Sequence, residues 1–402
     1  MKRPTETAAS VIHFLFSSAK IRARMPAETR HDSATNYTWM PTEQQLAEAN
    51  VHRLARALGC SGYHELHRVS IEEPDRFWRA VVADLGIPLA RDWDAVLDDS
   101  RGIEWTTWFV GARLNVATAC VHRWARETPD RDAAVWVPEK GERRSLTWAE
   151  LSREVRTLAE ALRELGVGAG DAVGTFLPMA PEAAIASHAC AHIGAVQVPI
   201  FSGFAGPAVS SRLADAGAKL VLTADASYRR GKLVPMKAVL DDALAGAPGV
   251  ENVLVWRRAG VECPMTAGRD WWWEDAVAQQ PGELEAVEVE SEAPYLLAYT
   301  SGTTGKPKGA LHVQGGFLLS IARETAYQAD LDAGDRVLFA TDMGWIMGPW
   351  TVTGAMACGA TVVFMEGAPD RPHDRVWQIV ADERITMLGV SPTLVRALIP
   401  HG

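Results

Sequence analysis

The sequence predicts an α/β protein in which parallel-rich sheets are flanked by helices. Beyond Arg123, short apolar runs alternate with amphipathic segments, a pattern typical of parallel strands joined by crossover helices. Over 402 residues the composition is 48% hydrophobic and 22% charged, which is enough to bury substantial cores. A loop rich in glycine and hydroxyl residues directly follows one of the apolar runs.

Residues 1–40 are basic in their first part, contain many Ser, Thr and Ala residues and show only weak periodicity, so we expect a disordered tail. A mitochondrial-type transit peptide is the alternative, although Glu6 and Glu28 are unusual in such peptides. The next segment, 41–122, is expected to form a helical, tryptophan-rich cap. Its first helix begins near Thr42 and ends near Gly59, because apolar residues recur at helical spacing up to that glycine.

The segment 123–402 contains the predicted sheet elements in order. Strands are expected at 133–137, 172–177, 196–200, 220–223, 253–256, 295–299, 337–341, 361–365 and 387–390. Helices are expected in the gaps, notably at 148–165, 182–193, 207–216 and 392–398.

Residues 299–309 read YTSGTTGKPKG and form the predicted phosphate-binding element. Glycines let the backbone approach phosphate oxygens, hydroxyl groups donate hydrogen bonds, and lysines supply compact positive charge. A Walker A loop is excluded, because Pro307 follows Lys306 where Ser or Thr would hold magnesium. The candidate phosphate ligands are Thr300, Ser301, Gly302, Thr303, Thr304, Gly305, Lys306, Lys308 and Gly309.

This run resembles the signature loop of the adenylate-forming superfamily, which includes acyl-CoA synthetases, luciferases and peptide-synthetase adenylation domains. The phrase EWTTWFVGARLNVATACVHR is similar to the N-terminal segment of acetyl-CoA synthetase-like proteins. The resemblance implies the N-terminal domain of an adenylate-forming enzyme, with 123–402 as its AMP-binding domain. In that family the loop wraps the β- and γ-phosphates of ATP while a carboxylate attacks the α-phosphorus, forming an acyl-adenylate and pyrophosphate. Coenzyme A then takes the acyl group.

A basic turn supplies Arg229, Arg230 and Lys232 within four positions. By composition alone it reads as a solvated surface turn. The resemblance implies instead a contact with the phosphates of CoA, and it adds Met347 and Asp370 to the CoA-binding set. A second adenylating reading, with a carrier-protein thiol as acceptor, is disfavoured by this turn.

The segment ATDMGWIMGPW follows the strand 337–341 and is similar to the acyl-pocket segment of short-chain acyl-CoA synthetases. The resemblance places Trp345, Ile346 and Met347 at the acyl pocket, where an indole floor would exclude long chains. Packing of Trp345 under the sheet is the alternative. Acetate enzymes usually carry threonine where Met347 stands and asparagine where Asp370 stands, so the pattern favours an acetoacetyl-CoA synthetase or a related synthetase. For His312, orienting the carboxylate and capping its strand remain equal alternatives.

No Tyr-Gly-x-Thr-Glu-like run follows the loop, and the adenylation lysine of the family is expected beyond Gly402. We therefore expect the chain to stop before the C-terminal domain of the family, to contain no secure catalytic residue and to be inactive alone. A downstream-encoded fragment would be its partner. The alternative is a non-catalytic remnant that binds a nucleotide or a partner synthetase.

The net charge of −10 argues against nucleic acid as the main partner. Five scattered cysteines, with no CxxC pair and no metal-ligand spacing, predict reduced thiols and no metal site. No apolar run approaches the roughly 18 residues that span a bilayer, so we expect a cytoplasmic protein without membrane contact. The expected substrates are a small carboxylate, ATP with Mg²⁺ and CoA, with no tightly bound cofactor.

Overall fold

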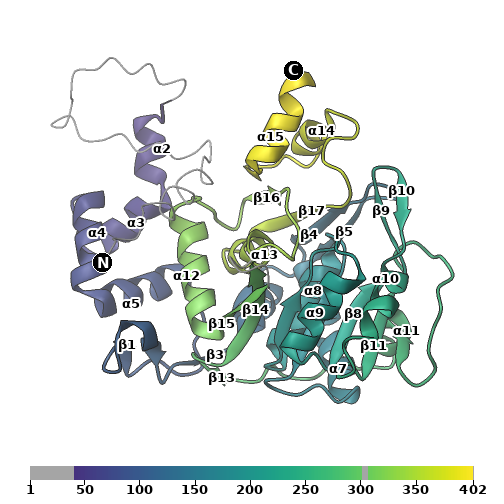
Figure 1. Ribbon diagram of the computed structural model, residues 1–402. Coiled ribbons are helices and arrows are strands. Elements are labelled where there is room, and N and C mark those ends of the chain that lie inside the picture. The colour runs from purple at the N-terminus through teal and green to yellow at the C-terminus, as the bar shows by residue number, and fades with distance from the viewer. Residues whose placement is uncertain (1–39, 301–306, 402) are drawn as a thin grey trace, which may run out of the picture.

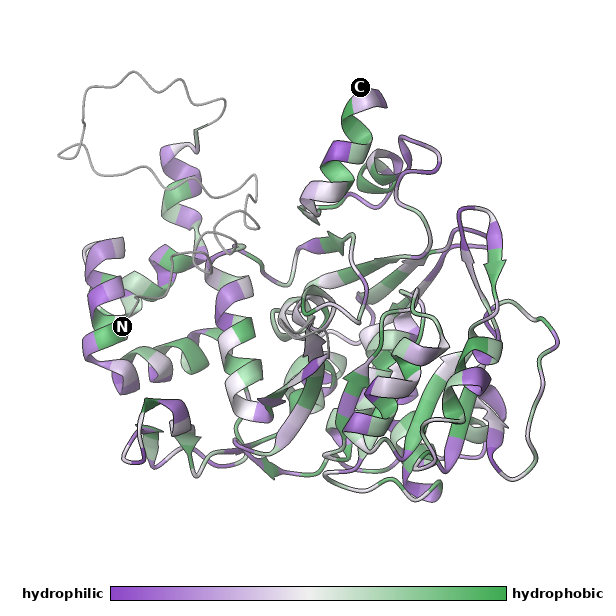
Figure 2. Cartoon of the chain, viewed as in Figure 1, coloured by the Kyte–Doolittle hydropathy of each residue, from purple (hydrophilic) through white to green (hydrophobic). Residues whose placement is uncertain are grey.

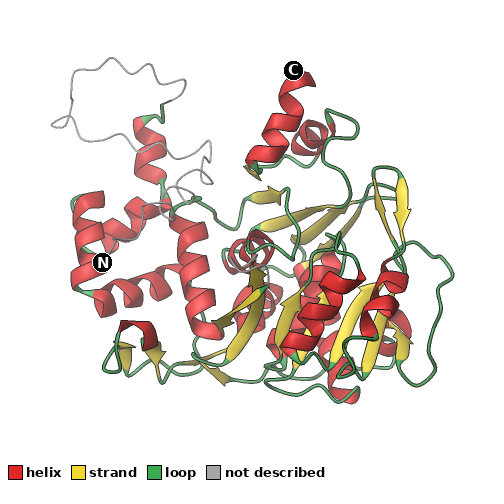
Figure 3. Ribbon diagram, in the orientation of Figure 1, coloured by secondary structure: helices red, strands yellow, loops and turns green. Residues whose placement is uncertain are grey.

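The computed structural model describes residues 40–300 and 307–401 of the chain (Figure 1). Residues 1–39 of the predicted tail and positions 301–306 of the predicted phosphate loop lie outside the described residues. Beyond Arg123 the chain forms two sheets, each mainly parallel, with helices packed around them (Figure 3). The predicted fold class, α/β with parallel-rich sheets flanked by helices, is confirmed. The division into two sheets was not predicted.

The larger sheet has seven strands in the order β12-β11-β8-β6-β7-β14-β15. Neighbouring strands are parallel except for β14 and β15, which form an antiparallel edge hairpin. The central strands are largely hydrophobic (Figure 2), as expected for a sheet covered on both faces. The strands are β6 (Ala172–Phe176), β7 (Val196–Pro199), β8 (Leu220–Ala224), β11 (Asn252–Trp256), β12 (Asp270–Trp272), β14 (Pro294–Thr300) and β15 (Lys308–Val313).

The smaller sheet has five strands in the order β18-β16-β17-β4-β5. Only the β4–β5 pair is antiparallel. Its strands are β4 (Asp132–Val137), β5 (Arg144–Thr147), β16 (Arg336–Phe339), β17 (Thr361–Met365) and β18 (Met387–Gly389). All nine strands expected from apolar runs therefore exist, whereas β5, β12 and β15 were missed because they are short or polar.

The helices begin and end where local chemistry favours it. Helix α7 opens with a capping box, in which the Glu150 N–H donates to the Thr147 hydroxyl and the Thr147 N–H donates to the Glu150 carboxylate. Helix α9 ends at Gly217, whose φ of +59° suits glycine. The helices beyond the cap are α6 (Arg123–Glu127), α7 (Trp148–Glu164), α8 (Pro181–His192), α9 (Gly206–Ala216), α10 (Met236–Leu244), α11 (Trp273–Val277), α12 (Gln314–Tyr327), α13 (Met347–Ala357), α14 (Arg375–Asp382) and α15 (Pro392–Leu398).

The N-terminal segment packs against α12, beside the β14–β15 edge (Figure 1). It contains a small antiparallel hairpin as well as the expected helices. The Tyr327 hydroxyl of α12 donates to Asp84, and Arg53 donates to the same carboxylate. The elements are α2 (Glu43–Glu48), α3 (Asn50–Ala57), α4 (Tyr63–Glu72), α5 (Pro74–Leu85), β1 (Ala95–Asp98), β2 (Thr107–Val110) and β3 (Arg113–Leu114), and β3 pairs with β13 (Val289–Glu290).

The single helix expected between Thr42 and Gly59 is wrong, because the chain breaks into α2 and α3 at Ala49, which is extended. Asn50 explains the break. Its backbone N–H donates to Asp330, and its side-chain amide donates to the carbonyl groups of Ala326 and Leu331. These long-range contacts turn the chain toward α12, a preference that helical spacing does not encode.

Within the described ranges, no helix has the length and apolarity needed to cross a bilayer. All five cysteines are free thiols, and four of them are buried. Burial raises the pKa of the Cys190 thiol to about 12, which makes it a packing residue rather than a nucleophile.

Candidate functional site

A cleft of 890 Å³ opens where the carboxyl ends of strands from both sheets meet. Open α/β sheets place their ligands at this end of the strands. The segments that follow β6, β7, β16, β17 and β18 all contribute to its wall. Its lining includes Pro178, Met179, Phe201, Ser202, Gly203, Ser227, Tyr228, Arg229, Val234, Phe339, Ala340, Thr341, Asp342, Trp345, Met347, Met365, Glu366, Gly367, Pro369, Ser391 and Thr393.

Asp342 joins the two sheets at the cleft. Its carboxylate accepts a hydrogen bond from the Ser202 hydroxyl at 2.5 Å and another from the Gly344 N–H at 2.9 Å. Burial raises the pKa of Asp342, although these donors oppose the shift. At Gly344 a Cβ atom would lie 2.2 Å from the Phe201 nitrogen, so only glycine allows this approach. The contacts hold the turn that carries the predicted acyl-pocket residues.

Trp345 lines the cleft with 57% of its surface exposed. Its ring lies beside Phe201, with 6.0 Å between the ring centroids. Packing of Trp345 beneath the sheet is therefore wrong for this structure. Met347, the first residue of α13, also lines the cleft, whereas Ile346 is 44% exposed and is not part of the lining.

The predicted basic turn is the tip of a two-stranded hairpin formed by β9 (Ser227–Arg229) and β10 (Lys232–Val234). Arg229 belongs both to the cleft lining and to a neighbouring recess of 460 Å³. Asp370 does not line either space. Its carboxylate forms an ion pair with the guanidinium group of Arg230 at 3.1 Å. The recess is lined by Arg229, Arg230, Lys232, Leu233, Val234, Pro235 and Arg371.

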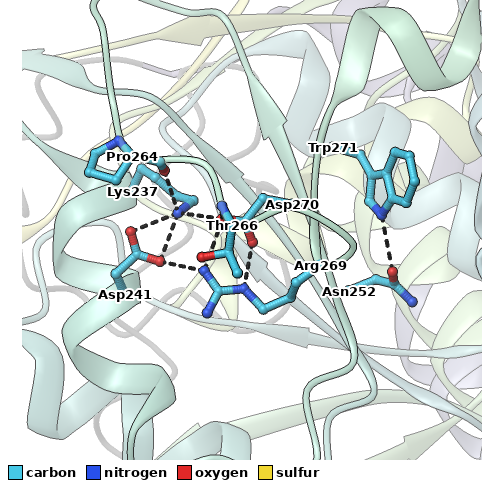
Figure 4. Close-up of polar contacts among 8 residues, drawn as sticks. All are labelled: Lys237, Asp241, Asn252, Pro264, Thr266, Arg269, Asp270 and Trp271. Carbon is cyan, nitrogen blue, oxygen red and sulfur yellow. Dashed lines mark hydrogen bonds and ion pairs between the residues drawn. The ribbon is translucent and has the colours of Figure 1, made fainter.

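A buried ion-pair network anchors the helix that follows the hairpin (Figure 4). The side chain of Lys237, on α10, is 0% exposed. Its ammonium group contacts Asp241 at 2.7 Å, Asp270 at 2.9 Å and the Pro264 carbonyl oxygen at 2.9 Å. Arg269 contacts both carboxylates, at 2.8 Å and 2.6 Å. The network ties α10 to edge strand β12 and so fixes the base of the hairpin.

The described ends of the predicted phosphate loop are Thr300, at the end of β14, and Lys308 and Gly309, at the start of β15. Thr300 pairs with Lys308 in the hairpin register. Next to them, the Tyr299 hydroxyl donates to Asp215 at 2.6 Å. Positions 301–306 lie outside the described residues, so their role remains a prediction.

Arg212 links the loop end of this hairpin to the cleft wall. Its guanidinium group lies 5.7 Å from the centre of the Tyr299 ring and 4.3 Å from that of Phe204. Phe204 in turn contacts Phe201, which lines the cleft. The hairpin that carries the loop is therefore connected to the site through the rings of Tyr299, Phe204 and Phe201 and the guanidinium group of Arg212.

His312 lies within β15 and packs edge-on against Phe317, with 5.2 Å between the ring centroids. Burial lowers its pKa. It is not among the residues that line the cleft. His312 therefore lies inside its strand rather than at a capping position, and its contact with a substrate carboxylate stays a prediction.

Reasoning from the sequence missed three charged residues of the site: Asp342, Glu366 and Arg371. Asp342 and Glu366 directly follow strand segments and precede glycines or a Met-Gly pair, which is a usable signal for a ligand-facing turn. Glu366 is 2% exposed at its side chain and contacts Arg258 at 2.6 Å. Arg371 has no such signal, because only the fold brings it to the hairpin.

The chain matches two described families. Residues 121–402 match the AMP-binding enzyme family, and residues 63–120 match the acetyl-coenzyme A synthetase N-terminus. The first match alone covers more than half of the chain.

Similar proteins include the acetyl-coenzyme A synthetase of Deinococcus radiodurans, which is 44% identical over 344 residues, 85% of this chain and 52% of that protein. The 3-hydroxypropionyl-coenzyme A synthetase of Sulfurisphaera tokodaii is 40% identical over 89% of this chain and 55% of that protein. The solved acetoacetyl-CoA synthetase from Streptomyces lividans superimposes with a TM-score of 0.84 at 32% identity, over 90% of this chain and 56% of that one.

The chain thus spans about half the length of the curated relatives that it matches. The chain belongs to the AMP-binding enzyme family.

Proposed function

We propose that this chain serves the ATP-dependent, AMP-forming ligation of a small carboxylate to CoA through an acyl-adenylate. The observation that carries the proposal is a cleft whose lining includes Trp345, residues of the basic hairpin and residues at the strand ends of both sheets. Family membership supports the reaction class. A cleft with an aromatic wall at one place, Arg229 at another and a basic recess beside it suits a reaction that joins a small acid to a phosphate-rich thiol.

Different residues would bind different parts of the substrates. Thr300, Lys308 and Gly309, with positions 301–306, would hold the β- and γ-phosphates, since amide and hydroxyl donors with lysines offset their charge. The carboxylate oxygen would attack the α-phosphorus, forming one P–O bond while the bond to pyrophosphate breaks. The CoA thiol then attacks the acyl carbon and AMP leaves. Orientation of these reactants is the main contribution that such a cleft makes.

ATP would enter with Mg²⁺. Within residues 40–300 and 307–401, no group of three His, Cys, Asp or Glu side chains is placed to hold a metal ion.

Carboxylate-dependent exchange of pyrophosphate into ATP tests the proposal. The exchange is measured for the 402-residue chain. It is also measured for a fusion, called the joined protein, of this chain with the part of the Deinococcus radiodurans relative that lies outside the match. Exchange with at least one short acid is expected in the joined protein. Exchange with none would overturn adenylation. ATP binding without exchange in either protein would favour the alternative, a non-catalytic nucleotide-binding protein.

Replacing Trp345 tests the acyl pocket. We expect Trp345→Ala in the joined protein to raise the ratio of hexanoate to acetate activity by at least about tenfold, because the indole occupies volume that a longer chain needs. Initial rates with each acid measure the ratio. Trp377→Ala is the matched control, since Trp377 is 50% exposed but lies on α14, outside the cleft lining. An unchanged ratio in the Trp345 variant would remove this residue from the pocket.

Replacing Arg229 tests the CoA site. We expect Arg229→Ala to weaken CoA binding by the 402-residue chain about 10- to 100-fold, because hydrogen bonds to charged groups contribute about 1.5–3 kcal/mol. Isothermal calorimetry measures the affinity, and Arg126→Ala, an exposed arginine on α6, is the control. Equal affinities for the two variants would show that the hairpin is a solvated turn, the alternative left open by composition.

A further inference from the structure

Glu139 lies where the basic hairpin meets the smaller sheet. It follows β4, and its carboxylate accepts hydrogen bonds from backbone N–H groups of two segments that are far apart in the sequence. One oxygen accepts from Gly231 at the hairpin tip, and the other accepts from Ala368 at 2.6 Å. Both flanking segments contribute residues to the cleft or its neighbouring recess. One carboxylate thus connects the hairpin tip to the segment 366–370. We call this edge of the cleft, where the two segments meet, the cleft mouth.

The approach of Glu139 to the segment after β17 requires glycine. Gly367 has a φ of +88°, and a Cβ atom built on it would lie 2.1 Å from the second carboxylate oxygen of Glu139. No side chain fits between them. Burial raises the pKa of Glu139, but the backbone donors of Gly231, Ala368 and Arg230 outweigh it and lower the pKa overall. The carboxylate is therefore ionised at neutral pH, the form that accepts both hydrogen bonds.

The hairpin depends on such contacts for its position. Strands β9 and β10 have three residues each and pair only with one another, in a two-stranded sheet. A lone hairpin of this size is marginally stable in water. Arg230 reaches Asp370 at 3.1 Å, but this arginine is 52% exposed, and exposed ion pairs hold geometry weakly. Glu139 adds a hydrogen bond from the hairpin backbone itself to a charged acceptor on a separate segment.

We propose that Glu139 is a positioning residue that clasps the hairpin tip to the segment 366–370 and thereby sets the affinity of the cleft mouth for the phosphate groups of CoA. The inference rests on the proposed function for its ligand, but the clasp itself does not. Glu139 acts through the placement of Arg229 and Lys232, because its carboxylate is occupied by backbone donors and would repel phosphate.

Glu139→Gln tests the clasp, and Glu142→Gln is its matched control. Both residues lie between β4 and β5, and both substitutions remove one negative charge, but Glu142 is exposed. In the 402-residue chain we expect Glu139→Gln to weaken CoA binding about tenfold, because a neutral acceptor replaces a charged one and one amide oxygen must serve two donors. Hydrogen exchange should also accelerate in peptides covering 229–234 and 366–371, and in neither peptide for Glu142→Gln.

A second pair of variants approaches the same junction from the other side. Gly367→Ala should displace Glu139 and reproduce both changes. Gly170→Ala is its control, since Gly170 has a similar φ of +83° but no atom within 4 Å of an added Cβ. Adding Glu139→Gln to Gly367→Ala should change CoA affinity little further, because both act on one contact.

The outcomes separate this proposal from the proposed function. Unchanged exchange in Glu139→Gln overturns the clasp, and accelerated exchange with unchanged CoA affinity overturns its effect on the ligand. If the unaltered chain binds no CoA, the proposed function loses its CoA site, while the exchange data still decide whether Glu139 holds the hairpin. Improved CoA affinity in Glu139→Gln would show that its charge opposes the ligand and would also overturn the proposal.

Discussion

Lys237→Met is expected to lower the free energy of unfolding by about 3–5 kcal/mol, because it removes a buried cation that two carboxylates share. The Lys237 and Asp270 side chains are both 0% exposed. Without the ammonium group, Arg269 alone must balance Asp241 and Asp270, and the Pro264 carbonyl loses its donor. Equilibrium urea denaturation of the 402-residue chain measures the loss.

Two further variants give this result its meaning. Lys219→Met is the matched control, because Lys219 also pairs with an aspartate but is 29% exposed, and such pairs contribute about 0–1 kcal/mol. Adding Asp270→Asn to Lys237→Met should restore part of the lost stability, since it removes one of the stranded charges. A loss no larger than that of the control would show that water reaches this network and that it does not fix the base of the hairpin.

Stability is expected to fall steeply below about pH 6.5, because histidines that are neutral and buried in the fold become protonated on unfolding. Burial lowers the pKa of His188 to about 3, and the ring is fully buried. Burial also lowers the pKa of His122 and His192, which lie in contact and would repel one another if charged.

Hydrogen bonds identify the tautomers of this pair. The His192 Nε2 group donates to the Leu284 carbonyl oxygen at 3.0 Å, so its Nδ1 atom accepts from the Nε2 group of His122 at 2.9 Å. The Nδ1 atom of His122 then accepts from the Ser152 hydroxyl at 2.8 Å. Each ring uses its single proton, and a second proton on the Nδ1 atom of His192 would face the Nε2–H group of His122 rather than an acceptor.

The lowered histidine pKa values make the protein less stable at acidic pH. A folded pKa below the unfolded value means that the unfolded state binds more protons between the two, so stability is full above pH 6.5 and is lost as pH falls toward the folded pKa. Each such histidine contributes a slope of about 1.4 kcal/mol per pH unit, and three together about 4 kcal/mol per pH unit near pH 5.

Urea denaturation at a series of pH values measures the slope. His188→Leu should reduce it by about 1.4 kcal/mol per pH unit, and His64→Leu, at an exposed position on α4, is the surface control. A slope that stays the same in His188→Leu would contradict the assignment of a buried neutral ring at this position.

Much of the fold was predictable because each strand contains its own signal. The run 361–365 is apolar throughout, and β17 spans the same residues, Thr361–Met365. The described ends of the predicted phosphate loop and the basic turn are exposed, as a row of glycines, hydroxyls and cations leads one to expect, whereas their ligands stay predictions. The assembly of strands into two sheets was not predicted, because strand order depends on which faces are buried together.

The candidate site shows the same division. The family resemblance singled out Trp345 and Arg229, and the structure places both in the lining of one cleft, while their roles stay predictions. The residues that join its walls were not found. Glu139 and Arg371 have no local signal in the sequence. Glu139 gains its place from Gly231, and Arg371 lines the recess beside the hairpin only because the fold brings it there.

The sequence by itself determined the family, several helices and most strands of the two sheets, because these depend on neighbouring residues and on hydrophobic period. The tertiary structure alone decided the break at Ala49, the burial of Lys237 and the clasp at Glu139. These features depend on charges and backbone groups that meet across long stretches of chain. Hydrogen-bond partners and burial are properties of the packed fold, and no local pattern records them.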